Sequence, residues 1–203
     1  MSRKFAFLPR SGLAAATLAA ASLVLAGCSA TANSPEARAT PAEQRAEINS
    51  GADATLTRLY QAAPRSKQLV QDAKGVLIFP SVLGASFVVG GEYGKGVLRV
   101  GNKPQSYYTV AGGSLGFQAG AQSRATVLLF MTDEALQRFR NSDGWTVGAD
   151  AHVAVATIGA NGSIDTNTAR QPVVGFVLNN AGLAAGVAID GSKVTPDLRL
   201  SGN

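Results

Sequence analysis

The sequence contains few of the residues that metal binding and catalysis use most. Its 203 residues include one cysteine and one histidine, and charged side chains make up only 15% of the chain. A single cysteine cannot form a disulfide within the chain, so the fold must depend on packing. One histidine leaves zinc without its usual set of ligands, and Asn161, Asp165 and Asn167 do not have the spacing of an EF-hand loop. We therefore expect no metal and no cofactor.

The apolar run near the N-terminus is too short for a membrane-spanning helix. It extends from Gly12 to Leu25, which is 14 residues, whereas a helix needs about 20 residues to cross a bilayer. Arg3, Lys4 and Arg10 precede it. A basic start followed by a short apolar run is typical of an export signal, so we expect residues 1–27 to be a signal peptide.

The single cysteine directly follows this run. Leu25-Ala26-Gly27-Cys28 resembles the lipobox of bacterial lipoproteins. The resemblance implies cleavage before Cys28, attachment of diacylglycerol to its sulfur and a further acyl chain such as palmitate on its amino group. Ser29 replaces the Asp that resembles an inner-membrane retention signal, so we expect an outer-membrane protein that faces the periplasm. The alternative is an incidental cysteine at the end of a signal peptide.

Little net charge remains after the signal peptide is removed. Residues 28–203 hold 15 lysines and arginines against 13 acidic residues, so composition does not indicate a nucleic-acid partner. Residues 28–41 are rich in Ala, Thr, Ser and Pro, which predicts a flexible, lipidated tether. Residues 42–203 are enough for one domain with its own hydrophobic core.

Two helices are predicted before the glycine-rich part. Apolar residues recur at three- and four-residue spacing from Pro41 to Pro64. This helix could lie on a membrane or pack on a sheet, and its acidic residues favour packing. A second, short helix is expected from Ser66, as its N-cap, to Gly75.

The region from Gly75 to Met131 combines apolar residues with glycine. Eleven of the 23 glycines lie between Gly75 and Gly120, among Val, Leu, Ile, Phe and Tyr. Glycine inside a strand marks a bend, a bulge or a close approach. We expect six short strands with brief antiparallel connections and a turn at 102–105; the strands are Val76–Phe79, Ala85–Tyr93, Val97–Val100, Ser106–Ala111, Ser114–Ala121 and Ala125–Met131.

The C-terminal part continues this pattern after one helix. Thr132 is expected to cap a helix that ends near Asn141. Further strands are predicted at His152–Ile158, Val173–Leu178 and Gly182–Ile189, with a turn at 161–162. Because strands outnumber helices, the predicted fold is α+β, with a strongly bent, mainly antiparallel, glycine-rich sheet or partial barrel and a few packed helices.

Two motifs for catalysis are incomplete. Gly90–Gly96 lacks the spacing of a phosphate-binding loop, and Gly112–Gly116 matches Gly-x-Ser-x-Gly without a helix-forming sequence after it. We therefore expect no catalytic residue, with a small serine esterase using Ser114 as an alternative. His152 is expected to be a structural, hydrogen-bonded histidine.

Basic residues are concentrated in one part of the chain. Residues 65–103 contain six lysines and arginines against two acidic residues. This asymmetry predicts an anion-facing surface, and the candidate residues for lipid headgroups are Lys74, Lys95, Arg99 and Lys103. The alternative is that these charges are solvated strand ends.

Four blocks of the sequence resemble the SYLF domain family. They are Asp72–Pro80, Gly90–Leu98, Gly112–Gln122 and Ala181–Gly191, and the resemblance covers about residues 45–191. In eukaryotic relatives this domain is associated with phosphoinositide membranes and, in some members, with actin. For this chain the resemblance implies binding of anionic or acyl lipid without catalysis; actin binding does not carry over to an envelope protein.

Three interpretations of the function remain open. The first is a lipid-anchored envelope protein that binds lipid, either on its basic residues or in an apolar pocket left by the glycines between the strands and helices. The second is a structural or assembly protein of the envelope, with an unidentified protein partner and no lipid selectivity. The third is the serine esterase.

Overall fold

The computed structural model describes residues 39–202 except 157–163, 181, 185–188 and 190, and leaves out the side chains of 85–89, 114–121 and 166. The predicted signal peptide, Cys28, most of the tether and the turn at 161–162 lie outside the described residues. Thr40–Asn203 forms one compact unit. This unit contains the sheet and both hydrophobic clusters, so experiments on the folded part can omit the first 39 residues.

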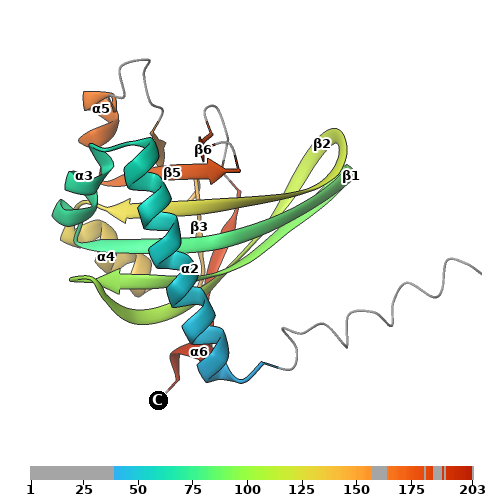
Figure 1. The fold of residues 1–203 in the computed structure, drawn as a ribbon, viewed down its shortest axis with the longest axis horizontal. Helices are drawn as coiled ribbons and strands as arrows, with labels where there is room; N and C mark the ends of the chain where they lie inside the picture. Colours follow the sequence, from blue (N-terminus) through green and yellow to red (C-terminus); the bar gives the residue numbers. More distant parts are fainter. Residues whose placement is uncertain (1–38, 157–163, 181, 185–188, 190, 203) are drawn as a thin grey trace, which may run out of the picture. The chain divides into compact units, whose positions relative to one another are not determined.

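The first described helix, α2, is Pro41–Ala62, as the apolar spacing predicts. A capping box starts it: the Glu43 backbone N–H donates to the Thr40 hydroxyl, and the Glu43 carboxylate accepts from the Thr40 backbone N–H. Ala52 and Leu59 are fully buried against the sheet, and Figure 1 shows α2 lying across the strands. The predicted packing is therefore confirmed. Within the described part of the chain, no helix is both long and apolar enough to cross a membrane.

The second helix, α3, is Ser66–Asp72, and its predicted cap is wrong. The N-cap is Arg65, which makes no capping hydrogen bond with its side chain. Ser66 is buried inside the first turn, where its hydroxyl donates to the Ala63 carbonyl oxygen at 2.6 Å. The Ser66 hydroxyl, which the sequence alone assigns to capping α3, therefore bonds to the C-terminal end of α2.

The glycine-rich region forms two long strands instead of six short ones. Strand β1 is Gly75–Val100 and β2 is Lys103–Phe130, and they pair antiparallel along their length. They are joined at Gly101 and Asn102, whose φ angles are 57° and 63°. Two successive positive φ values match a tight type I′ hairpin turn, which spans 100–103 and so lies two residues earlier than the predicted turn at 102–105. Figure 1 shows both strands extending to one side of the sheet and bending back.

Glycine lets the half of β1 that follows the bend, the returning half, lie against the half that precedes it. A Cβ atom on Gly96 would lie 2.5 Å from the Ile78 carbonyl oxygen, and one on Gly94 would lie 2.6 Å from the Ser81 carbonyl oxygen. No larger residue could replace these glycines without displacing the backbone beside them. The glycines therefore do not end the strands; they allow a long strand to bend sharply and pack on itself.

The other strands extend this sheet on both sides of β2. On one side β2 pairs with β5 (Val173–Asn179), which also pairs with β6 (Gly182–Leu183) and, in parallel, with β4 (Ala154–Val155). On the other side it pairs with β7 (Lys193–Pro196), which pairs with β3 (Trp145–Thr146). The strand predicted at 173–178 is confirmed, and those predicted at 152–158 and 182–189 are shorter within the described residues.

Three helices complete the described part. Helix α4 is Asp133–Arg140, and the Thr132 hydroxyl accepts from the Ala135 backbone N–H, as predicted. The short helices α5 (Thr166–Ala169) and α6 (Leu198–Ser201), like β3 and β7, carry too little periodic signal to be predicted. The architecture is an α+β fold with a strongly curled, mostly antiparallel sheet in a half-barrel form, which confirms the predicted class.

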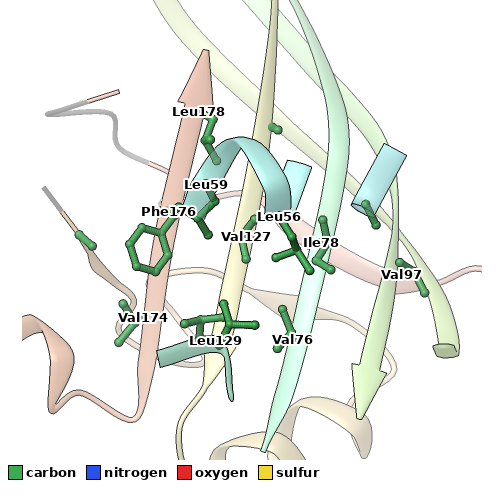
Figure 2. Close-up of a cluster of buried hydrophobic side chains, with 14 of the residues drawn as sticks. Leu56, Leu59, Val76, Ile78, Val97, Val127, Leu129, Val174, Phe176 and Leu178 are labelled. Atoms are coloured by element: carbon green, nitrogen blue, oxygen red, sulfur yellow. The ribbon is translucent and has the colours of Figure 1, made fainter. Parts of the chain in front are cut away.

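The core consists of two clusters on opposite faces of the sheet. Leu56 and Leu59 of α2 pack against the face that carries Ile78, Val127 and Phe176 (Figure 2). The opposite face carries Leu77, Phe79, Leu128 and Phe130, which pack with Phe139 and Trp145. Because alternate residues of β1 and β2 are buried on opposite faces, the strands are continuous apolar runs and not alternating ones.

Candidate functional site

An open groove lies where β1 bends. A Cβ atom on Gly84 would lie only 3.9 Å from the Cβ of Glu92, so the outgoing and returning parts of β1 meet here. The groove has a volume of about 470 Å³, within the range of small-molecule sites. Its described lining consists of Leu83, Gly84, Gly91, Glu92, Tyr93, Gln122 and Ser123.

Two large apolar side chains are exposed in this lining. Leu83 is 57% exposed and Tyr93 is 47% exposed. In the described part of the chain, Leu198 is the one other large hydrophobic residue with such exposure, and it does not line the groove. Exposed apolar side chains that gather beside a groove indicate a binding surface for an apolar partner.

A charged pair lies at the inner side of the groove. The side chain of Glu92 is only 8% exposed, and that of its partner Arg124 is 26% exposed. Arg124 Nη2 donates to Glu92 Oε2, and the Ser192 hydroxyl donates to Glu92 Oε1 at 2.7 Å. Sequence reasoning missed this cluster because its members are far apart in the chain, and no motif connects them.

Two of the four predicted headgroup residues contact α2. Lys95 Nζ donates to Gln44 Oε1 at 2.6 Å, and Arg99 forms an ion pair with Asp53 at 2.6 Å. Arg99 also donates to the Asn49 carbonyl oxygen, and its side chain is only 11% exposed. The side chains of Lys95 and Arg99 therefore link α2 to the returning half of β1.

The other two predicted residues are exposed. Lys74 directly precedes β1, and its backbone N–H donates to the Phe130 carbonyl oxygen at 2.8 Å. Lys103 begins β2 and pairs with Val100 next to the hairpin turn. Both lie at strand ends, as the alternative of solvated strand ends expects.

The residues of the esterase alternative lie in unsuitable surroundings. Ser114 is inside β2, where its backbone pairs with Gly90, and the strand continues to Phe130. A nucleophile elbow requires a sharp turn from strand to helix at the serine. His152 is exposed rather than structural, and it lines a separate cleft of about 390 Å³ beside Trp145. Within the described residues, no group of three or more His, Cys, Asp or Glu side chains could hold a metal ion.

Comparison with known proteins shows that part of the chain is similar to one family. Residues 111–200 match the family described as "Ysc84: Las17-binding protein actin regulator". Over 130 residues the chain is 28% identical to "SH3 domain-containing YSC84-like protein 1" of Homo sapiens and of Pongo abelii, and 27% identical to that of Bos taurus. These alignments cover 61% of this chain and 37–38% of the relatives. The chain thus spans little more than a third of the length of those relatives.

Proposed function

We propose that this chain is a non-catalytic protein that binds lipid through a Ysc84 (SYLF) domain, the family that its sequence blocks resemble and that residues 111–200 match. The family is one of binding domains. The family is described as an actin regulator, but a protein that is exported from the cell, as we propose for this one, would not meet actin. We therefore propose the membrane, and not actin, as the partner.

The observation that carries this proposal is the groove with Leu83 and Tyr93 on its lining. Glycine on both sides leaves the strand surface open, so an acyl chain could lie directly against the backbone. Burial of one leucine-sized side chain contributes about 1.5–3 kcal/mol. Leu83 and Tyr93 are both partly exposed, so contact with an acyl chain would remove their apolar surface from water and stabilise the complex.

The basic residues have a smaller part in this proposal. Lys95 and Arg99 are held by α2, so Lys74 and Lys103 are left to attract anionic headgroups. A lysine near an anionic membrane contributes about 1 kcal/mol, and salt weakens this attraction. Both lysines lie at the end of the hairpin away from the bend, roughly 20–30 Å from the groove at about 3.3 Å per strand residue. We propose that the groove supplies the affinity and that these two lysines add only a weak attraction at low salt.

The anchor is a separate part of the proposal. We propose that Cys28 is acylated and holds the protein in the outer membrane, facing the periplasm, as the lipobox resemblance implies. Cys28→Ser should release the protein into the soluble fraction or leave uncleaved precursor. Because the groove alone could hold the substituted protein on membranes, the test uses a chain in which Leu83 and Tyr93 are also replaced by serine. If that chain stays bound to membranes in high salt, the anchor is contradicted.

Vesicle co-sedimentation of Thr40–Asn203 tests the binding. Serine at both Leu83 and Tyr93 should lower binding to phosphatidylglycerol vesicles about tenfold or more, since about 1.4 kcal/mol corresponds to a factor of ten. Leu198→Ser is the matched control, because Leu198 is 78% exposed but does not line the groove. Equal binding by all three proteins would refute the groove.

Two further arms separate the alternatives. Lys74→Gln with Lys103→Gln should lower binding only at low salt, because screening already removes their contribution at high salt. If this variant instead loses nearly all binding, the basic residues and not the groove carry the function. Absence of binding by the wild-type protein would favour a structural or assembly role in the envelope.

A further inference from the structure

The bent end of the β1–β2 hairpin stands apart from the rest of the sheet. In the described part of the chain, β2 pairs with β7 at 108–111 and with β5 at 125–130, and between these stretches its one partner strand is β1. At the bend Ser86 pairs with Gly120, and Val88 pairs with Gly116. Figure 1 shows this end projecting on the side opposite α3 and α4. The bent end is therefore a two-stranded ribbon that extends from the sheet.

The groove lies on one face of this ribbon. Gly91, which lines the groove, pairs with Gly113, and Tyr93 pairs with Ala111. Residues directly opposite each other in an antiparallel pair share a face, and so do alternate residues of one strand. Gly113 therefore lies on the same face as Tyr93, which we call the groove face. A Cβ atom on Gly113 would meet nothing within 4 Å, so the groove face is open at this position.

The ribbon has no net charge around the bend. Residues 75–91 and 104–123 contain no Asp, Glu, Lys or Arg. Glu92 is the one charged residue in the described lining of the groove. Its carboxylate accepts hydrogen bonds from Arg124 and from the Ser192 hydroxyl, and its side chain is only 8% exposed. The groove face therefore presents no isolated charge to its surroundings.

The groove face does present apolar side chains to solvent. Leu83 and Tyr93 are the two large apolar residues exposed there. An exposed apolar surface without charge suits a partner that offers hydrocarbon and needs no fixed set of polar contacts. Tyrosine is enriched at the boundary between membrane and water, where its ring contacts acyl chains and its hydroxyl stays hydrated. Both observations favour a lipid bilayer as the partner of this face.

The charged end of the hairpin lies far from the groove face. Lys74 precedes β1 and Lys103 begins β2, and both are exposed. They lie roughly 20–30 Å from the groove at about 3.3 Å per strand residue. The hairpin thus has one uncharged, apolar end and one charged end. This charge distribution matches a boundary between hydrocarbon and water, with the uncharged end toward the hydrocarbon.

The free edge of the ribbon limits how deep it can lie. Between 112 and 124 the outer edge of β2 pairs with no strand of the described part. Backbone N–H and C=O groups without partners are costly inside the hydrocarbon core. At the boundary of headgroups and acyl chains, about 5–10 Å deep, headgroups and water still reach such groups. The ribbon therefore suits an interfacial position and not a membrane-spanning one.

We propose that the groove face of the bent end docks on an intact lipid bilayer, with Leu83 and Tyr93 at the boundary of headgroups and acyl chains and the charged end of the hairpin in water. The proposal rests on the lipid-binding function above, and it names the partner as a bilayer surface and not as a lipid molecule taken out of the membrane.

A single fluorescent label on the groove face tests the proposal. Thr40–Asn203 contains no cysteine, because the one cysteine of the chain is Cys28, so Gly113→Cys can carry a nitrobenzoxadiazole dye. With phosphatidylcholine vesicles its emission should shift to shorter wavelength, and lipids with a nitroxide high on the acyl chain should quench it. Lys103→Cys is the matched control, whose label should stay in water. Both labelled proteins should unfold at the urea midpoint of the wild-type protein, and equal responses of the two labels would overturn the proposal.

A charge placed on the groove face provides a second test. Gly113→Asp should lower co-sedimentation with phosphatidylcholine vesicles severalfold, because the carboxylate would have to leave water. Gly113→Ser is the uncharged control and should bind as the wild-type protein does. Neutral vesicles exclude repulsion between the new carboxylate and anionic headgroups. If both variants bind equally, or if the wild-type protein binds only anionic vesicles, the groove face does not dock as proposed.

The remaining outcomes separate this inference from the function on which it rests. If the protein carries fluorescent lipid into the supernatant while the label at position 113 reports no contact with vesicles, it binds extracted lipid; the lipid-binding function stands and the inference is wrong. If the emission of this label shifts without vesicles as protein concentration rises, a second copy of the chain covers the groove face, and the inference is again wrong. Absence of binding to any vesicle would overturn both proposals.

Discussion

Gly96→Ala should destabilise the protein because the returning half of β1 packs against its first half at this point. The added Cβ would lie 2.5 Å from the Ile78 carbonyl oxygen and 2.5 Å from Phe79 Cδ1. Ile78 and Phe79 are almost fully buried, so neither can move away into solvent. The φ angle of Gly96 is not positive, which means that the expected cost comes from crowding alone. Overpacking of this kind costs about 1–3 kcal/mol.

Gly113→Ala is the matched control for this substitution. Gly113 lies in β2 of the same hairpin, but a Cβ atom there would meet nothing within 4 Å. Alanine in a strand interior is favoured over glycine by about 0.5–1 kcal/mol, so this variant should be equal to or slightly more stable than the wild-type protein. Urea unfolding of Thr40–Asn203, followed by circular dichroism, compares the three proteins. If both variants have the same free energy of unfolding, close packing does not explain the glycines.

Four other predictions follow from the structure. Phe139→Ala should lower the free energy of unfolding by about 3–5 kcal/mol, because Phe139 is 1% exposed and contacts Tyr108, Phe130 and Trp145. A variant with the same midpoint of urea unfolding as the wild-type protein would contradict this. Hydrogen bonds from the backbone and side chain of Thr40 lower the pKa of Glu43 below 4.5, so the capping box should stabilise α2 above that pH and lose its contribution as pH falls through the lowered pKa. An NMR titration should show that the pKa of Glu43 rises in Thr40→Ala. Asp53→Asn should weaken the attachment of α2 by removing the ion pair with Arg99, and faster hydrogen exchange of amides in α2 would show it, while exchange in α4 should not change. Ser114→Ala and His152→Ala should bind lipid as the wild-type protein does, and loss of an esterase activity in either variant would revive the catalytic alternative.

The sequence predicts the fold class because its apolar periodicity and its glycines act locally. The spacing from Ile48 to Leu59 predicts α2, and Thr132 predicts the start of α4. The division of the hairpin into six strands failed because Gly94 and Gly96 have the same appearance in sequence whether they end a strand or allow close packing. What separates the two cases is the backbone of residues 78–81, which lies beside them only after folding.

The candidate site was predicted in part. The apolar pocket was expected between strands and helices, whereas the described lining of the groove belongs to β1 and β2, and no motif identified Leu83 or Tyr93. The charge asymmetry selected Lys95 and Arg99 as headgroup residues but could not show that they bond to Gln44 and Asp53 of α2. The pair of Glu92 and Arg124 depends on the register between the two long strands, which is a property of the folded sheet.

Photo-crosslinking tests the central claim most directly, because it locates the lipid on the protein. Thr40–Asn203 would be illuminated with vesicles that contain a fatty acid with a photoreactive group near the end of its chain, and the labelled peptides would be identified by mass spectrometry. We predict that the label is attached to the groove residues 83–84, 91–93 and 122–123, and that labelling falls when Leu83 and Tyr93 are both replaced by serine. Labelling concentrated on α2 or α4, with these residues unmodified, would contradict the proposed groove.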